Sequence, residues 1–184
     1  MTRLEPIHPS ELDPEQKSLY DCITEGPRAQ GPKHFDLTRD DGALLGPFNA
    51  LLLSPHLGSA LQELGGAVRY RTGLSARTRE IAILTVATCW NSPFERTAHE
   101  SVGQAVGLRA DEMSEIRAGR VPTLADPHER ACAHLVRSMV EGDVDDEAWA
   151  NWAHVVGTAS VFELTTLVGY YATLALQMRV FRTD

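Results

Sequence analysis

The sequence predicts an all-α protein, and three observations carry this prediction. Helix start signals recur along the chain as an N-cap residue followed by proline, or by glutamate or glutamine three residues later. Glycine stands where most of the expected helices should end. Apolar residues recur at spacings of three and four, and no segment alternates apolar and polar residues over the length of a strand.

The N-terminal part is predicted to hold one helix and a long loop. Asp13 is the expected N-cap, Pro14 the first helical residue and Gln16 the capping-box partner of a helix over 14–24. Glycine, proline and Asp-Gly signals then gather between residues 26 and 46, and a loop of this length is usually functional or mobile.

The chain is predicted to form a single domain. Residues 1–45 supply the N-terminal helix and the loop, and residues 46–184 form the helical core, so that residues 1–184 make one domain of about eight helices. Caps and breaks place the helices of this core at 47–53, 55–70, 76–90, 93–106, 111–118, 127–141, 145–157 and 160–181.

Two of these helices should be central. The helix over 76–90 has apolar residues on more than one face, which is typical of a helix surrounded by others. The last helix carries one apolar stripe with spacings of three and four, made of Val161, Leu164, Val168, Tyr171, Ala175 and Met178.

Charge and cysteine content exclude several functions. Seventeen basic against 25 acidic residues give a net charge of −8, which argues against nucleic acid and anionic membranes as partners. Three widely spaced cysteines form neither a disulfide framework nor a zinc finger.

The N-terminus has no apolar signal core, and the apolar stretch at 161–176 is shorter than the roughly 20 residues of a membrane span. We therefore expect a cytoplasmic protein.

Two polar residues fall on helix faces that are otherwise apolar. Glu80 shares its face with Ile83, Leu84 and Ala87, and a buried carboxylate must be paired or protonated. A structural ion pair with a nearby arginine explains this position equally well. His99 lies in an apolar stripe one turn after Glu95, which can orient the imidazole and raise its basicity.

Each of the two residues on the second helix also has a purely structural interpretation. His99 can be a core histidine bonded to a carbonyl group, and Glu95 can serve only the helix start at Ser92. The sequence leaves both alternatives open.

The segments Leu74-Ser75-Ala76-Arg77-Thr78-Arg79-Glu80-Ile81-Ala82-Ile83-Leu84 and Phe94-Glu95-Arg96-Thr97-Ala98-His99-Glu100 resemble the carboxymuconolactone decarboxylase family. This family belongs to the alkylhydroperoxidase D-like superfamily. The resemblance implies a helical bundle that assembles as a homotrimer or homohexamer, with Glu80 and His99 at the family's functional positions. The Cys-x-x-Cys of the peroxidase branch is missing, and Cys89 is the only thiol nearby.

The resemblance and the residues together favour a cofactor-independent lyase acting on a small enolisable acid or lactone. Glu80, His99 and Glu95 would handle protons at the wall of a solvent-reachable cavity, and no metal is expected. The expected substrate-binding residues, from arginines that can hold a carboxylate and histidines near the long loop, are Arg77, Arg69, His56 and His34.

Two alternatives remain open. One is a thiol peroxidase that uses Cys89, and the other is a helical oligomer without catalytic activity. Isomerisation, dehydration and cyclisation would need the same proton-handling pair as decarboxylation.

Overall fold

The structure, a computed structural model, describes residues 2–26, 30 and 35–183. All regular secondary structure in these residues is helical, and an isolated antiparallel bridge joins Thr38 to Leu44. The all-α prediction is therefore confirmed for the part of the chain that the structure describes.

The chain divides into two compact units. One consists of Met1–Arg71 together with Leu174–Asp184, and the other of Thr72–Thr173. Neither boundary coincides with the division expected near residue 45, and the single-domain organisation remains a prediction.

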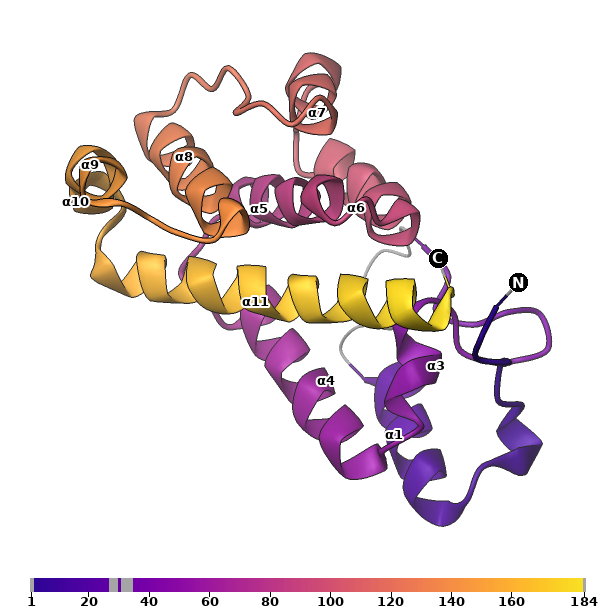
Figure 1. Ribbon diagram of the computed structural model, residues 1–184. Helices are drawn as coiled ribbons and strands as arrows, with labels where there is room; N and C mark the ends of the chain where they lie inside the picture. Colours follow the sequence, from indigo (N-terminus) through magenta and orange to yellow (C-terminus); the bar gives the residue numbers. More distant parts are fainter. Residues whose placement is uncertain (1, 27–29, 31–34, 184) are drawn as a thin grey trace. The chain divides into compact units, whose positions relative to one another are not determined.

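The described residues of the first unit before residue 72 form a short 3₁₀ turn and three α-helices. They are η1 (Pro9–Glu11), α1 (Pro14–Glu25), α3 (Pro47–Leu51) and α4 (Pro55–Tyr70). Helices α1 and α3 pack against α4 (Figure 1). Gly58 permits the close approach of α3 and α4, because a Cβ atom at this position would lie 2.3 Å from the carbonyl oxygen of Leu51. The core of this unit is formed by Leu19, Ile23, Leu44, Phe48, Leu51 and Leu52.

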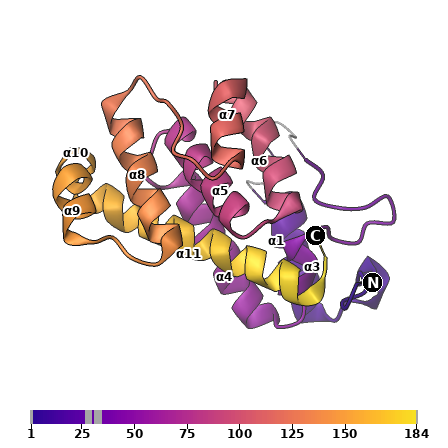
Figure 2. The ribbon, with the colours of Figure 1, turned by 45° about the horizontal axis from the view of Figure 1, so that its top comes forward.

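The second unit is built around α5 (Ala76–Cys89). Helices α6 (Pro93–Ala105), α7 (Ala110–Arg117) and α8 (Pro127–Glu141) all contact it (Figures 1 and 2). Every residue of α5 from Glu80 to Ala87 is buried, so the helix is central as predicted.

The segment expected to form one helix at 145–157 is interrupted. It contains α9 (Asp146–Ala148), the π-helical turn η2 (Trp149–Ala153) and α10 (His154–Val156), which lie against α8. Trp152 stacks on His134 of α8, with ring centroids 4.2 Å apart and 1° between the ring planes. The spacing of apolar residues within one segment does not reveal a contact with another helix.

The last helix, α11 (Thr158–Phe181), runs through parts of both units. All six residues of its predicted apolar stripe are buried. By length and composition α11 is long and apolar enough to cross a membrane, but core helices of soluble proteins meet the same criterion. Glu163 in its first half accepts the backbone N–H of Gly73, at 3.0 and 3.1 Å from its two oxygens.

Candidate functional site

Glu80, Glu95 and His99 meet between two packed helices of the second unit. Glu80 projects from α5, and the other two project from α6. Oε2 of Glu80 lies 2.6 Å from Nδ1 of His99, and Oε2 of Glu95 lies 3.4 Å from Nε2. The structure thus brings together the three residues predicted to handle protons.

The start of α6 explains how Glu95 reaches the imidazole. Ser92 is the N-cap, and its hydroxyl accepts the N–H of Glu95 at 3.5 Å. The backbone N–H of Ser92 donates to the carbonyl oxygen of Ala87 at 2.9 Å. Glu95 is one helical turn before His99, and its carboxylate lies against the ring. Glu95 is therefore more than a helix-start residue.

The pKa of His99 is raised above its ordinary value of 6.5. Burial lowers the pKa, but attraction to Glu80 and the hydrogen bonds that the imidazole donates to both carboxylates outweigh the burial. The raised pKa favours the protonated imidazole, which has one carboxylate facing each ring nitrogen.

The three side chains are almost sealed from solvent. His99 is 2% exposed, Glu80 5% and Glu95 4%. Two of the hollows at described residues, one between α1 and α4 and one near the N-terminal segment, are lined by other side chains. The solvent-reachable cavity expected beside His99 remains a prediction.

Tyr171 of α11 is a neighbour that sequence reasoning missed. Its ring stands edge-on to the imidazole of His99, with centroids 5.2 Å apart and 90° between the planes, and Tyr170 packs edge-on against Tyr171. The sequence placed Tyr171 only in the apolar stripe of the last helix. The residue type gave no reason to place it beside the histidine.

Arg77 lies in a structural ion-pair network. Its Nε is 3.0 Å from Glu129 of α8, its Nη2 is 3.1 Å from Glu112 of α7, and Nη1 donates to the carbonyl oxygen of Gly107. The guanidinium thus joins α5 to α7 and α8. Its expected substrate-binding role remains a prediction.

The other expected substrate-binding residues lie outside the second unit. His56 is exposed and lies 3.6 Å from Glu15, and the guanidinium of Arg69 lies 5.7 Å from the ring centre of Tyr70. His34 lies outside the described residues. Their binding roles remain predictions.

Residues 2–26, 30 and 35–183 contain no group of three or more histidine, cysteine or acidic side chains arranged to hold a metal ion.

Residues 55–138, which run from the start of α4 into α8, match the model of the carboxymuconolactone decarboxylase family. The resemblance predicted from the sequences around Glu80 and His99 is therefore confirmed. No curated protein matches this chain in sequence.

Several solved structures are similar to this chain in fold. A protein of unknown function from Agrobacterium tumefaciens, for which a role as the antioxidant defence protein AhpD has been suggested, is 19% identical. The match covers 74% of this chain and 94% of that one, with a TM-score of 0.65.

The debrominase Bmp8 is 10% identical to this chain, and both a ligand complex and the apo form are similar in fold. A cysteine-to-alanine variant in complex with 2,3,4-tribromopyrrole has a TM-score of 0.73 over all of this chain and 91% of that one. The apo form has a TM-score of 0.71 over 97% and 89%. At these identities the likenesses show a shared AhpD-like helical fold and nothing about the reaction.

The raised pKa of His99 predicts a pH-dependent stability difference between the wild type and Glu80→Gln. Below pH 6.5 the histidine is protonated in the folded and unfolded states, and the pair contributes fully. As the pH rises through the higher folded pKa, the charge and its contribution are lost. We expect Glu80→Gln to cost about 2 kcal/mol in urea unfolding near pH 6, and progressively less at higher pH.

Glu100→Gln is the matched control, because it removes a carboxylate that pairs with Arg117 at the surface, away from His99. If the difference in unfolding free energy between the wild type and Glu80→Gln stays constant or grows above pH 6.5, that result would contradict a charged pair of Glu80 and His99.

Proposed function

We propose that the protein is a cofactor-independent lyase that decarboxylates, or moves a proton on, a small enolisable carboxylic acid or lactone. The 2.6 Å hydrogen bond between Glu80 and His99, inside the family segment, is the observation that carries the proposal. A buried, protonated imidazole held by a carboxylate is a suitable proton donor to carbon.

The proposed reaction begins when the C–C bond to the substrate carboxylate breaks. Carbon dioxide leaves, and the bonding electron pair is delocalised onto the conjugated carbonyl group as a dienolate. His99 then donates its Nε2 proton to carbon, and the imidazole becomes neutral. A proton from solvent restores the imidazolium.

The two carboxylates have different parts in this proposal. Glu80 contacts Nδ1 at 2.6 Å, so it fixes the ring and stabilises its positive charge. Glu95 contacts Nε2 at the longer distance of 3.4 Å, so a substrate carbon can take its place at that nitrogen. The proton that leaves is therefore the one on Nε2.

An anionic substrate also requires a cation, because the triad carries two carboxylates for one imidazolium. We keep Arg77, Arg69, His56 and His34 as the proposed substrate-binding residues for this purpose. The proposed location of the protein is the cytoplasm.

We also propose a homotrimer or homohexamer. Large apolar side chains are exposed on the chain, including Phe162 at 71%, Leu57 at 60% and Val180 at 48%. Association would cover such side chains. Sedimentation equilibrium at micromolar concentration should give a trimer or hexamer, and a monomer would contradict this assembly.

The test of the proposed activity uses 4-carboxymuconolactone and a panel of β-keto and lactone acids in D₂O. Carbon dioxide release with deuterium at the former carboxyl carbon indicates decarboxylation. Deuterium uptake without carbon dioxide indicates isomerisation or a related reaction. If the wild type produces neither, the proposed function fails.

The exposures of 2–5% at the three side chains favour a second candidate, a helical protein without catalytic activity. In that case the triad only joins α5 to α6, and none of the assayed acids is turned over. The same experiment therefore separates the two candidates.

No observation favours a thiol peroxidase. Cys89 is exposed and its thiol donates to the carbonyl oxygen of Val140 at 3.6 Å. Cys132 is buried, and burial raises the pKa of its thiol to about 12, so it is not a thiolate at neutral pH. We expect Cys89→Ser to leave turnover in the D₂O assay unchanged.

A further inference from the structure

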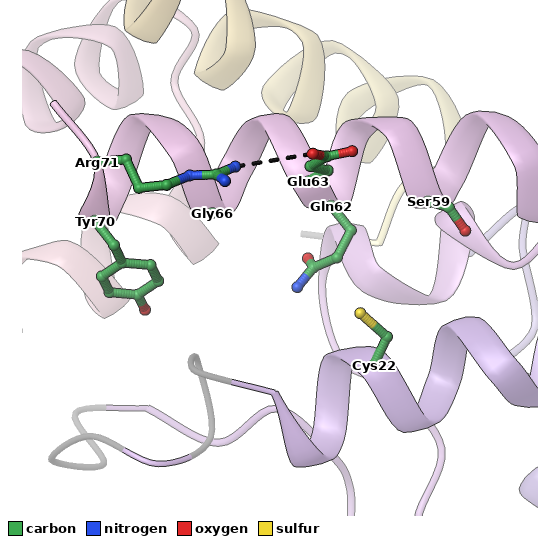
Figure 3. A pocket seen from close by; sticks show the side chains of 7 residues that line it. All are labelled: Cys22, Ser59, Gln62, Glu63, Gly66, Tyr70 and Arg71. Carbon is green, nitrogen blue, oxygen red and sulfur yellow. Dashed lines mark ion pairs between the residues drawn. The ribbon is translucent and has the colours of Figure 1, made fainter.

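The first unit contains a hollow that has no part in the proposed chemistry. It lies between α1 and α4, has a volume of about 570 Å³ and is lined by Cys22, Ser59, Gln62, Glu63, Gly66, Tyr70 and Arg71 (Figure 3). This volume falls within the range of about 300–1,000 Å³ found for small-molecule sites.

The Gln62 amide and the Cys22 thiol face each other across the middle of this hollow (Figure 3). The Cys22 thiol points from α1 toward α4, and the ring of Tyr70 stands at the end of α4 (Figure 3). A Cβ atom added at Gly66 would meet nothing within 4 Å, so the wall is open at this position. Together these groups leave room for the apolar body of a ligand.

One guanidinium, that of Arg71, is among the groups that line the hollow. Arg71 extends along α4 toward Glu63, and the nearest atoms of the two charged groups are 4.0 Å apart (Figure 3). Both side chains are largely exposed, at 62% and 79%, and an exposed pair at this separation contributes little. Arg71 can therefore turn to a ligand carboxylate, which it can bind through two parallel hydrogen bonds.

We propose that the hollow between α1 and α4 binds a small amphipathic monocarboxylic acid. Arg71 holds the carboxylate, and the apolar body lies over Gly66 between Tyr70 and Cys22. This site goes beyond the proposed function, and its test measures binding, so the two can fail separately.

The rate at which the Cys22 thiol is alkylated reports whether a ligand occupies the hollow. The probe is 3-phenylpropionate, its uncharged control is 3-phenylpropionamide, and iodoacetamide alkylates the thiol in a Cys89→Ser background. Cys132 does not compete, because it is buried and the pKa of its thiol is raised to about 12. Mass spectrometry follows the alkylation rate at fixed pH.

The acid should slow alkylation of Cys22 with a hyperbolic concentration dependence, by about tenfold at about ten times its Kd. The amide should give no protection. Arg71→Gln should weaken protection by at least about tenfold. Gly66→Leu should abolish it, because the new side chain fills the hollow, whereas Gly66→Ala should leave most of it intact.

Glycine inside a helix is less stable than alanine or leucine at the same position, so both Gly66 variants should fold. Circular dichroism checks that they do. If Gly66→Leu does not fold, two other results test whether the hollow binds the acid: the loss of protection in Arg71→Gln, whose side chain is exposed, and the comparison of acid with amide. The proposal is overturned if the acid gives no protection at millimolar concentration, if acid and amide protect equally, or if folded Gly66→Leu is protected like the wild type. An alkylation rate that falls with protein concentration alone would place a second copy of the chain on the hollow and would also overturn it.

Discussion

Replacing His99 with glutamine is expected to reduce turnover of the acid substrate by about 10²–10⁴-fold. Glutamine keeps a polar side chain of similar reach but has no proton to donate at neutral pH. This range is the usual contribution of a positioned general acid or base. The variant should fold, as judged by circular dichroism, and the comparison uses initial rates in the deuterium and carbon dioxide assays.

Replacing Glu80 or Glu95 should affect turnover less than replacing His99, and the two variants should shift its pH profile to different extents. Glu80→Gln removes the partner of Nδ1 and should shift the pH profile of turnover to lower pH, because the pKa of His99 then loses its main upward influence. Glu95→Gln weakens only the 3.4 Å contact and should shift the profile less.

The control for both variants is His154→Gln, because His154 is exposed and belongs to α10 rather than to the triad. If folded His99→Gln retains wild-type turnover, the triad does not carry the reaction.

Replacing Glu112 with alanine is expected to lower the free energy of unfolding by about 3–5 kcal/mol. Glu112 is fully buried, with an exposed fraction of 0%. Its carboxylate lies 3.1 Å from Arg77 and 2.7 Å from Arg109, and it accepts the N–H of Arg109 at 2.8 Å. The substitution leaves an incompletely paired guanidinium and an uncapped start of α7.

Urea unfolding measures this cost, and Glu100→Ala is the matched control. Glu100 pairs with Arg117 at the surface, so its loss should cost at most about 1 kcal/mol. Equal costs for the two variants would contradict the structural role assigned to the Arg77 network.

Most helix boundaries could be predicted because their signals are local. Asp13 accepts the N–H of Gln16 at 2.8 Å, and the Gln16 side chain returns to the Asp13 N–H at 3.0 Å, as the capping box requires. Gly142 ends α8 with a φ of 108°, a conformation that favours glycine. The π-helical turn at Trp149 could not be predicted, since the His134–Trp152 contact comes from a different helix.

The candidate site was predictable only in part. A glutamate and a histidine on apolar helix faces indicate buried, paired groups, and Glu80 and His99 indeed contact each other. The role of Arg77 could not be predicted, because its partners Glu112 and Glu129 lie 35 and 52 residues further along the chain. Tyr171 was missed because an aromatic residue in an apolar stripe carries no signal for a neighbouring imidazole.

The protonation state of His99 can be measured directly by ¹⁵N NMR, with its resonances assigned by comparison with His99→Gln. Because Glu80 and Glu95 face the two ring nitrogens, both nitrogens should be protonated at pH 7, and the titration should fall to lower pH in Glu80→Gln. A neutral imidazole at pH 7 with one unprotonated nitrogen, and a titration unchanged in Glu80→Gln, would contradict a proton donor held between two carboxylates.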